Sequence, residues 1–308
     1  MRYLITGGLG FIGSHLVEEL LSHKHKVTII DNLSTGSRHN LQDHQNITLL
    51  EKNILECSSE ELMNGYDGLV HLAATPAVTQ SWQEPLSSHT NNISTTVAAL
   101  ELCQKLAIPR LVFASSAAVY GNPSQVPISE DSPTLPISPY GLHKLTSEQY
   151  IALFSEHLGI ASVNLRLFNV FGPRQDPSSP YSGVISIFAR AMSQGLPISI
   201  NGDGTQTRDF VYIKDVASAF AKALMVPREP GTTLTCNIGT GKAVSLMQLK
   251  ETLQTCFPTW QSITTLALPR LGDVQESQAD ITQAKVHLGF TPQFPLYEGL
   301  LALKQNLC

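Results

Sequence analysis

Eight residues near the N-terminus, Thr6-Gly7-Gly8-Leu9-Gly10-Phe11-Ile12-Gly13, constrain the fold of this chain more than any other segment. They follow a strand-like run, residues 3–5, and open a segment of helical character that ends at Ser22. Gly7 permits a tight turn, Gly10 lets a pyrophosphate approach the backbone, and Gly13 lets helix and strand pack closely. The free N–H groups of the helix start would then face phosphates. The motif predicts a dinucleotide site, whereas a flexible glycine loop is the simpler alternative.

The end of the second expected strand decides between these alternatives. Val27–Ile30 forms an apolar run, and Asp31 follows it about 20 residues after the glycine motif. A carboxylate at that place binds the adenosine ribose hydroxyls and repels a 2′-phosphate. A turn or cap role for Asp31 fits poorly with this combination, so we expect NAD rather than NADP.

Short apolar runs alternate with helical segments along the first half of the chain. This alternation predicts an α/β fold with a doubly wound parallel (Rossmann) sheet covered on both faces. After Phe168 the pattern loosens, and residues 172–183 are rich in turn formers. We expect an NAD-binding Rossmann domain at 1–168 and a smaller C-terminal substrate-binding lobe at 169–308, with some chain returning to the first domain. The expected strands are Tyr3–Ile5, Val27–Ile30, Ile47–Leu50, Gly68–His71, Leu111–Ala114 and Ala161–Leu165, and the expected helices Phe11–Ser22, Asn91–Leu106 and Tyr140–Leu158.

Composition excludes several other classes of protein. The net charge is −5 and no basic stripe occurs, so we expect no nucleic-acid partner. Five cysteines lie far apart without metal-ligand spacing, which predicts neither a disulfide framework nor a metal site. No run of about 18 apolar residues and no signal-peptide pattern occurs, so we expect a cytoplasmic protein with no membrane span.

Tyr140 and Lys144 stand four residues apart after Pro139, a spacing that places both on one helix face. A nearby ammonium should lower the pKa of the phenol, so that Tyr140 can remove a hydroxyl proton. The buried run Leu111–Ala114 ends in Ser115 and Ser116, at the strand end where parallel sheets bind ligands. A surface Tyr–Lys pair and a turn-capping serine are the alternatives; the glycine motif favours a redox site.

These residues, taken together, resemble the extended short-chain dehydrogenase/reductases, and within them the UDP-glucose 4-epimerase group. The likeness runs nearly from end to end. It rests on ordered motifs: 6–13, Asp31 to Gly36, 71–74, Asn92, 115–121, Tyr140 with Lys144, 166–172, 202–215 and 270–280.

The resemblance implies roles for individual residues. Tyr140, Lys144 and Ser116 match the catalytic residues. The cofactor would contact Gly7, Gly10, Phe11, Ile12, Gly13, Asp31, Asn32, Ser34, Thr35, Gly36, Asn53, Ile54, Leu72, Ala73, Ala74, Thr75, Asn92, Ser115, Tyr140, Lys144 and Leu167. The nucleotide sugar would contact Ser116, Tyr140, Asn169, Val184, Arg208, Arg270, Asp273 and Ser277, with the two arginines clamping the pyrophosphate.

Two departures from the family pattern lie on the cofactor side. Asn53 stands where relatives usually carry Asp, but its amide can still pair with the adenine edge. Pro76 replaces a Lys of many relatives and removes a possible contact to the cofactor phosphates.

Ala117 and Ala118 indicate which reaction to expect. Related dehydratases carry Asp-Glu at these positions and the decarboxylases carry Glu, because these reactions need a further acid or base. Two alanines fit an epimerase, which inverts the sugar at C4 by transient oxidation with tightly bound NAD. Ser277, a small residue at a position that borders the sugar, predicts turnover of UDP-GlcNAc and UDP-GalNAc as well as UDP-Glc and UDP-Gal.

Three alternatives stay open. The substrate could be UDP-glucuronate, or the chain could be a nucleotide-sugar ketoreductase or dehydrogenase with net redox that releases its cofactor. A non-enzymatic dinucleotide-binding regulator is the third, although it would not need Tyr140 or Lys144. By resemblance, helices near 91–106 and 140–158 predict a homodimer.

Overall fold

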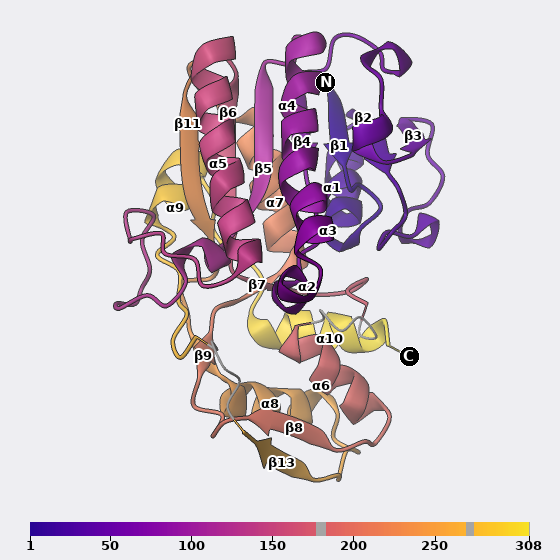
Figure 1. Cartoon of the computed structure of the whole chain (residues 1–308). Coiled ribbons are helices and arrows are strands. Elements are labelled where there is room, and N and C mark those ends of the chain that lie inside the picture. Colours follow the sequence, from indigo (N-terminus) through magenta and orange to yellow (C-terminus); the bar gives the residue numbers. More distant parts are fainter. Residues whose placement is uncertain (177–182, 269–273, 308) are drawn as a thin grey trace.

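The computed structural model describes residues 1–176, 183–268 and 274–307. Seven strands form a central sheet in the order β11-β6-β5-β4-β1-β2-β3, and every neighbouring pair is parallel (Figure 1). The strand order reverses between β1 and β4, which confirms the predicted doubly wound α/β fold. The strands are β1 Arg2–Thr6, β2 Lys26–Asp31, β3 Ile47–Glu51, β4 Gly68–His71, β5 Arg110–Ser116, β6 Ala161–Leu167 and β11 Thr233–Ile238.

Helices cover both faces of this sheet. On one face α4 (Thr95–Lys105) and α5 (Pro139–Leu158) lie side by side, and on the other α1 (Phe11–Ser22) packs against α7 (Ile213–Met225) (Figure 1). The inner strands are apolar nearly throughout because each of their faces meets a helix. Ile29 and Val70 are buried toward α1 and α7, while Leu69 and Leu111 are buried toward α4 and α5.

The predicted strands are all present and are longer at one or both ends, except Gly68–His71, which is unchanged. The helix expected at Asn91–Leu106 differs more. Residues Thr90–Ser94 form a π-helical turn, η4, before α4 begins. Thr95 and Thr96 donate hydroxyl hydrogen bonds to the carbonyls of Asn91 and Asn92, at 2.8 and 2.7 Å, and so compete with the regular backbone ladder.

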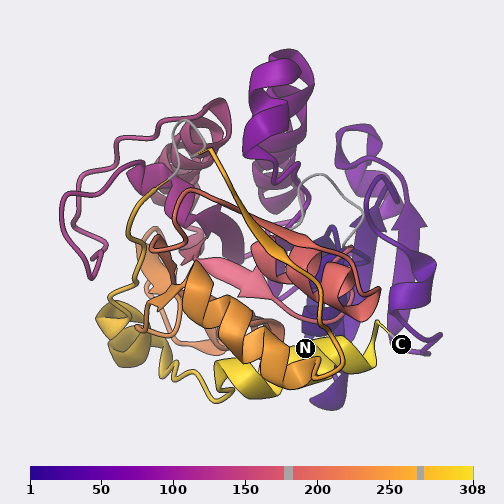
Figure 2. The same cartoon turned by 90° about the horizontal axis from the view of Figure 1, so that it is seen from below.

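A smaller group of elements lies below the carboxyl edge of the sheet. Its helices α6 (Val184–Ser193), α8 (Leu246–Cys256) and α10 (Leu296–Gln305) pack together, and α6 also packs against β8 (Figure 2). The strands pair as β8 Ile198–Asn201 with β13 Thr264–Ala267, β9 Thr207–Arg208 with β12 Val244–Ser245, and β7 Asn169–Phe171 with β10 Phe210–Tyr212.

The chain beyond Phe168 does not stay in this group. Helix α7 and strand β11 return to the central sheet, and α9 (Thr282–Leu288) packs on both. The exact division of the chain at residue 168 stays a prediction. Two short helices, α2 (Val78–Gln83) and α3 (Pro85–His89), lie between the sheet and the smaller group (Figure 1).

Candidate active site

The glycine motif forms a tight turn at the carboxyl end of β1. Gly7 adopts a φ of +70°, and a Cβ on it would lie 2.8 Å from the backbone nitrogen of Ala73. A Cβ on Gly13 would lie 2.1 Å from the carbonyl oxygen of Gly7. Both positions therefore require glycine, as predicted. The turn leaves the N-terminus of α1 open at the crossover point of the sheet, where a pyrophosphate would meet free N–H groups.

Thr6 joins this turn to the end of β4. Its Oγ1 accepts hydrogen bonds from the backbone nitrogens of Leu72 and Ala73, both at 3.2 Å, and lies 2.7 Å from Nδ1 of His71. Because both lone pairs of the hydroxyl are engaged, its proton must go to His71 Nδ1. His71 is therefore neutral with its proton on Nε2, and burial together with the charge of Lys144 lowers its pKa to about 3. The segment Leu72–Thr75, expected under the cofactor, is held from below by this contact.

Asp31 is buried at the end of β2, facing the glycine turn. Its carboxylate accepts hydrogen bonds from the backbone nitrogens of Leu9 at 2.9 Å and Leu33 at 2.8 Å. The loop Asn32–Gly36 folds back over it, and a Cβ on Gly36 would touch the carboxylate at 2.9 Å. Asp31 therefore has the turn role that the sequence left as an alternative. The same contacts fix its carboxylate beside the glycine turn, where a ribose would lie.

The remaining cofactor candidates are placed around this edge of the sheet. Asn53 caps a short 3-10 helix through its side-chain oxygen, and Ile54 is buried in the core. Asn92 is buried in the π-helical turn, and its Nδ2 donates to the carbonyl of Ser88 at 2.7 Å. The Oδ1 atom of Asn92 is buried without a hydrogen-bond partner in the described part of the chain. Such an orphaned acceptor fits a site completed by a bound donor.

Ser116 ends β5 and caps the 3-10 helix η5 (Ala117–Tyr120). Its Oγ accepts a hydrogen bond from the backbone nitrogen of Ala118 at 3.1 Å. The start of α5 approaches this turn so closely that a Cβ on Gly141 would lie 2.5 Å from the carbonyl oxygen of Ala118. Glycine after Tyr140 is what lets the helix reach the serine.

Tyr140 lies in the first turn of α5, which Ser138 caps through its hydroxyl. The backbone nitrogen of Tyr140 donates to Ser81 Oγ on α2 at 3.1 Å, a contact that no sequence pattern indicated. The ring is buried, and burial raises the pKa of the phenol to about 12, while the Ser116 hydroxyl beside it lowers the pKa. The predicted direction was wrong for the protein alone, because burial raises the pKa of the phenol by more than the hydrogen bond with Ser116 lowers it.

Lys144 lies one turn further along α5, on the same buried face. Its Nζ donates to the carbonyl of Ala114 at 2.8 Å and lies 4.7 Å from the centre of the Phe113 ring. Burial lowers the pKa of the ammonium to about 7, and the carboxylate of Glu148 opposes that effect. Lys144 and Tyr140 thus both titrate toward their neutral forms when no further charge is present.

Ser115 is oriented away from Ser116. Its hydroxyl donates a hydrogen bond to the carboxylate of Glu148 on α5. Alternate residues of a strand face opposite sides of a sheet, which separates the two serines. The side chain of Ser115 is thus engaged behind the strand, and its predicted contact to the cofactor stays a prediction.

Three candidate substrate residues lie in elements that follow the end of β6, at β7, β9 and α6. Asn169 begins β7 and is exposed, with its backbone nitrogen bonded to the carbonyl of Asp209 at 3.0 Å. Arg208, immediately before Asp209, is half-buried. Val184 begins α6. Leu167, which is expected at the cofactor, ends β6. Arg270 and Asp273 lie outside the described residues.

Ser277 is buried in a segment that is hydrogen-bonded on one side to β9 and on the other side to the loop after η5; these two sides are the two walls of this region. The backbone carbonyl of Gln275 in that segment accepts a hydrogen bond from the backbone nitrogen of Thr207. The backbone carbonyl of Gln278 accepts one from the backbone nitrogen of Ile128, in the loop after η5. Ser277 therefore lies between the strand that carries Arg208 and the loop that follows Ser116.

Asp209 is a residue that the sequence did not single out. Its buried carboxylate accepts backbone hydrogen bonds from Thr240 at 2.7 Å, Gly241 at 2.9 Å and Ala279 at 3.1 Å. It thereby ties the strand of Arg208 to the segment of Ser277. A carboxylate directly after a predicted phosphate-binding arginine was the one available signal.

Comparison with known proteins agrees with this fold. A sequence model of the NAD dependent epimerase/dehydratase family matches residues 3–239. The UDP-glucose 4-epimerase of Mycolicibacterium smegmatis is 35% identical over 311 residues, which cover 97% of this chain and 96% of that protein.

Solved structures match over nearly the whole chain. The UDP-N-acetylglucosamine 4-epimerase from Methanobrevibacter ruminantium, in complex with UDP-N-acetylmuramic acid, has a TM-score of 0.94 and 36% identity, covering 99% of this chain and 97% of that one. The UDP-glucuronic acid 4-epimerase from Bacillus cereus, in complex with UDP-glucuronic acid and NAD, has a TM-score of 0.91 and 31% identity, covering 100% and 99%.

Proposed function

The chain belongs to the NAD dependent epimerase/dehydratase family, and from this premise we propose that it interconverts UDP-hexoses epimeric at C4. One observation carries the proposal. Tyr140, Ser116 and Lys144 converge at the end of β5, while Ala117 and Ala118 supply no further acid or base there. That set is sufficient to invert a carbinol carbon and insufficient to eliminate water.

The glycine turn, Asp31 and Asn92 would hold NAD along the carboxyl edge of the sheet. Asp31 would receive the adenosine ribose, and the unpaired Oδ1 of Asn92 would accept a hydrogen bond near the nicotinamide half. Bound there, NAD would supply the hydride acceptor for C4 and the hydride donor for the return step.

The residues of the chain manage the proton. Tyr140, as phenolate, takes the proton from the 4-hydroxyl and gives it back after the sugar has turned over. Ser116 donates a hydrogen bond to O4 and stabilises the charge that shifts onto it. Lys144 provides the positive charge that favours the phenolate. The positive nicotinamide ring would add to that charge and offset the raised pKa that burial gives Tyr140.

The smaller group of elements would anchor the nucleotide diphosphate while the sugar rotates. Arg208, with Arg270 as its expected counterpart, suits two phosphate oxygens through the fork geometry of guanidinium. Asn169 stands beside Arg208 because the backbones of residues 169 and 209 are hydrogen-bonded. Because the diphosphate stays fixed while the hexose rotates, the single Tyr140 can exchange the proton of the 4-hydroxyl in both orientations of the sugar.

We propose that the sugar pocket admits N-acetylated hexoses. Ser277 is small and lies between the two walls that would enclose the hexose. The likeness to the UDP-N-acetylglucosamine 4-epimerase of M. ruminantium supports this breadth. The likeness to the B. cereus enzyme named for UDP-glucuronic acid makes that sugar nucleotide the second candidate.

The test is to incubate the purified protein with UDP-Gal, UDP-GalNAc and UDP-glucuronate in turn, without added NAD, and to resolve the products. The proposal expects UDP-Glc from the first and UDP-GlcNAc from the second. Tyr140→Phe should lower both rates by about 10²–10⁴. Conversion of UDP-glucuronate alone would favour the second candidate, and no conversion of any of the three would refute the proposal.

We further propose that two copies pair through α4 and α5. Leu142, Tyr150 and Leu153 are exposed and share one side of α5. Light scattering should show a dimer that Leu153→Lys converts to a monomer. Leu266→Lys, at an equally exposed leucine on β13, should leave the dimer intact. A monomeric wild-type chain would contradict this part of the proposal.

No helix among residues 1–176, 183–268 and 274–307 is long and apolar enough to cross a membrane.

A further inference from the structure

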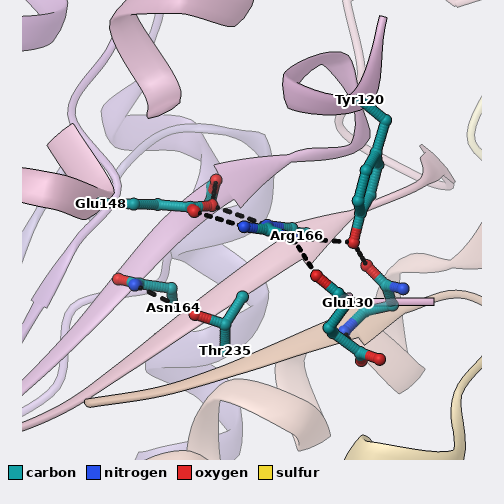
Figure 3. Close-up of polar contacts among 8 residues, drawn as sticks. Tyr120, Glu130, Glu148, Asn164, Arg166 and Thr235 are labelled. Atoms are coloured by element: carbon teal, nitrogen blue, oxygen red, sulfur yellow. Dashed lines mark hydrogen bonds and ion pairs between the residues drawn. The ribbon is translucent and has the colours of Figure 1, made fainter. Parts of the chain in front are cut away.

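A buried ion pair joins Arg166 to Glu148 on α5, the helix that also carries Tyr140 and Lys144; Figure 3 shows the pair. Arg166 on β6 grips Glu148 on α5 at two points, with Nε 3.0 Å from Oε1 and Nη2 2.7 Å from Oε2. Both side chains are less than a tenth exposed. A buried ion pair is weak evidence that the pair stabilises the fold, because a protein in which such a pair is replaced by well-packed apolar residues is often no less stable. Its position must therefore be explained in another way.

One end of the pair is joined to the catalytic elements. Glu148 Oε1 accepts the hydrogen bond of the Ser115 hydroxyl, and Ser115 directly precedes Ser116. Glu148 also lies one helical turn after Lys144 and two turns after Tyr140, on the same buried face of α5. The Ser115–Glu148 contact and the Lys144–Ala114 contact thus fasten β5 to α5 at adjacent residues.

The other end of the pair reaches the loop that follows Ser116. Arg166 Nη1 donates to the Tyr120 hydroxyl at 3.0 Å and to the carbonyl of Glu130 at 3.2 Å. Tyr120 donates in turn to Asn237 Oδ1 on β11 at 2.6 Å. Each of the three nitrogens of the Arg166 guanidinium thereby has an acceptor, so the side chain is held in one orientation (Figure 3).

The charges around Lys144 give the pair a second role. The groups that face the ammonium are Tyr140, His143 and Glu148 on α5, His71 on β4, and the Phe113 ring and Ala114 carbonyl on β5. His71 is neutral, as its contact with Thr6 shows. Glu148 is therefore the carboxylate among these groups, and Arg166, whose guanidinium keeps its charge, contacts both of its oxygens.

We propose that Glu148 and Arg166 are positioning residues that fix the catalytic helix against the strand of Ser116 and hold Lys144 as the charged partner of the Tyr140 phenolate. The inference rests on the proposed function for its kinetic consequence. Its electrostatic part concerns the NAD-bound protein, and it can be measured without substrate.

Glu148→Gln tests the electrostatic part, since it keeps the size of the side chain and removes its charge. Two buried cations then remain, and Lys144 alone can release a proton. The proton that Tyr140 and Lys144 share then lies more often on the phenol of Tyr140 than on the amine of Lys144. The catalytic form, which is the phenolate beside a charged Lys144, becomes less populated. With an effective dielectric constant of about 20 and about 6 Å between the Glu148 carboxylate and the Lys144 ammonium, Coulomb's law gives an effect of about 100-fold on the proton equilibrium of Lys144. The repulsion between Glu148 and the Tyr140 phenolate cancels part of this effect. We expect kcat to fall about tenfold.

The direct readout is the near-ultraviolet absorbance of phenolate in the NAD-bound protein, taken as the difference between each protein and its Tyr140→Phe derivative. Glu148→Gln should contain less phenolate than wild type at neutral pH. The acid limb of kcat/KM should also move to lower pH, because the lost carboxylate no longer holds protons on the pair. Equal phenolate absorbance together with an unchanged limb would overturn the proposal.

Asp215→Asn is the matched control. Asp215 is another buried carboxylate, and it accepts backbone hydrogen bonds from Gln293 at 2.8 Å and Phe294 at 3.2 Å, away from the catalytic residues. It should lose stability and keep the wild-type pH profile. If Glu148→Gln behaves like Asp215→Asn, with a lower Tm and the same profile, the role is only structural and the proposal is wrong.

Ser115→Ala tests the positioning part, because it removes one contact between β5 and α5 and leaves the ion pair. Its control is Ser155→Ala, which removes the Ser155–Ser162 hydrogen bond of 2.8 Å between the far end of α5 and β6. We expect Ser115→Ala to lower kcat several-fold with KM unchanged, and Ser155→Ala to alter neither. Equal kinetics of the two variants would overturn this part.

Should Glu148→Gln fail to fold, the double variant Glu148→Leu with Arg166→Met replaces the pair by apolar residues of similar size, an exchange that proteins often accept. The proposal expects this variant to fold and to contain less phenolate than wild type. Wild-type phenolate content in the folded double variant would overturn the proposal. Failure of the proposed function is a separate outcome, seen as a wild-type protein that converts no UDP-hexose.

Discussion

Replacing Thr6 with Val should weaken both the fold and the hold on NAD, although the two side chains have nearly the same shape. The substitution deletes the Oγ1 atom, which lies 2.7 Å from His71 Nδ1 and 3.2 Å from the backbone nitrogens of Leu72 and Ala73. The nitrogen of Leu72 keeps the Thr6 carbonyl as a partner at 3.1 Å. Those of Ala73 and His71 keep no partner that we can identify in the described part of the chain.

The size of the effect follows from these two groups. A buried polar atom left without its partner costs about 1–3 kcal/mol, and Ala73 is only partly buried, so the loss should be about 2–4 kcal/mol. For a protein of this size that loss corresponds to roughly 3–6 °C in Tm. The backbone at 72–75 also loses its support, so copurified NAD should decrease.

Thr28→Val is the control for this experiment. Thr28 is equally buried on the neighbouring strand β2, and it loses a single hydrogen bond, from the Tyr66 hydroxyl at 3.1 Å. We would measure Tm by thermal unfolding and NAD by its absorbance after the protein is denatured. The reasoning is refuted if the two variants lose the same stability and both retain wild-type amounts of NAD.

Two further predictions concern the sugar pocket and pH. Ser277→Tyr should lower kcat/KM for UDP-GalNAc at least 100-fold and for UDP-Gal less than about tenfold, because the added ring fills space that only the acetamido group needs; equal losses measured for both substrates would contradict the pocket assignment. His71, with a pKa of about 3 in the folded protein and 6.5 as its ordinary value, should remain neutral on folding while the unfolded chain binds a proton below pH 6.5. Stability should therefore fall by about 2 kcal/mol between pH 7 and pH 5 through this group alone. Urea unfolding should show a shallower loss in His71→Asn, whose amide oxygen can still accept from Thr6, and identical pH slopes would sink the argument.

Much of the nucleotide-binding half could be predicted from local pattern. Three features depend only on residues that are close together in the sequence: the glycine spacing, the acid at position 31 and the apolar strands. Gly7 and Gly13 are needed for the reason the spacing suggests, since a side chain on either would collide with backbone. The doubly wound order then follows from repeated βαβ units.

The parts that the sequence did not reveal depend on contacts between distant residues. Glu148 and Arg166 are 18 residues apart and meet because α5 packs on β5 and β6, where Ser115 is paired with Arg166. The clamp of Asp209 on residues 240–241 and 279 needs the path of the returning chain. The pKa of Tyr140 was predicted in the wrong direction because burial, unlike a Tyr–Lys spacing, cannot be read from four adjacent letters.

The most direct test of the account is the fate of the hydrogen on C4. UDP-galactose deuterated at C4 would be incubated with the purified protein, with unlabelled NAD added to the solution, and the product analysed by mass spectrometry and NMR. The account predicts UDP-glucose that keeps the deuterium at C4 with inverted configuration, and no label in the added cofactor. Loss of the deuterium to water or its transfer to the added NAD would contradict a closed epimerisation and indicate net redox chemistry.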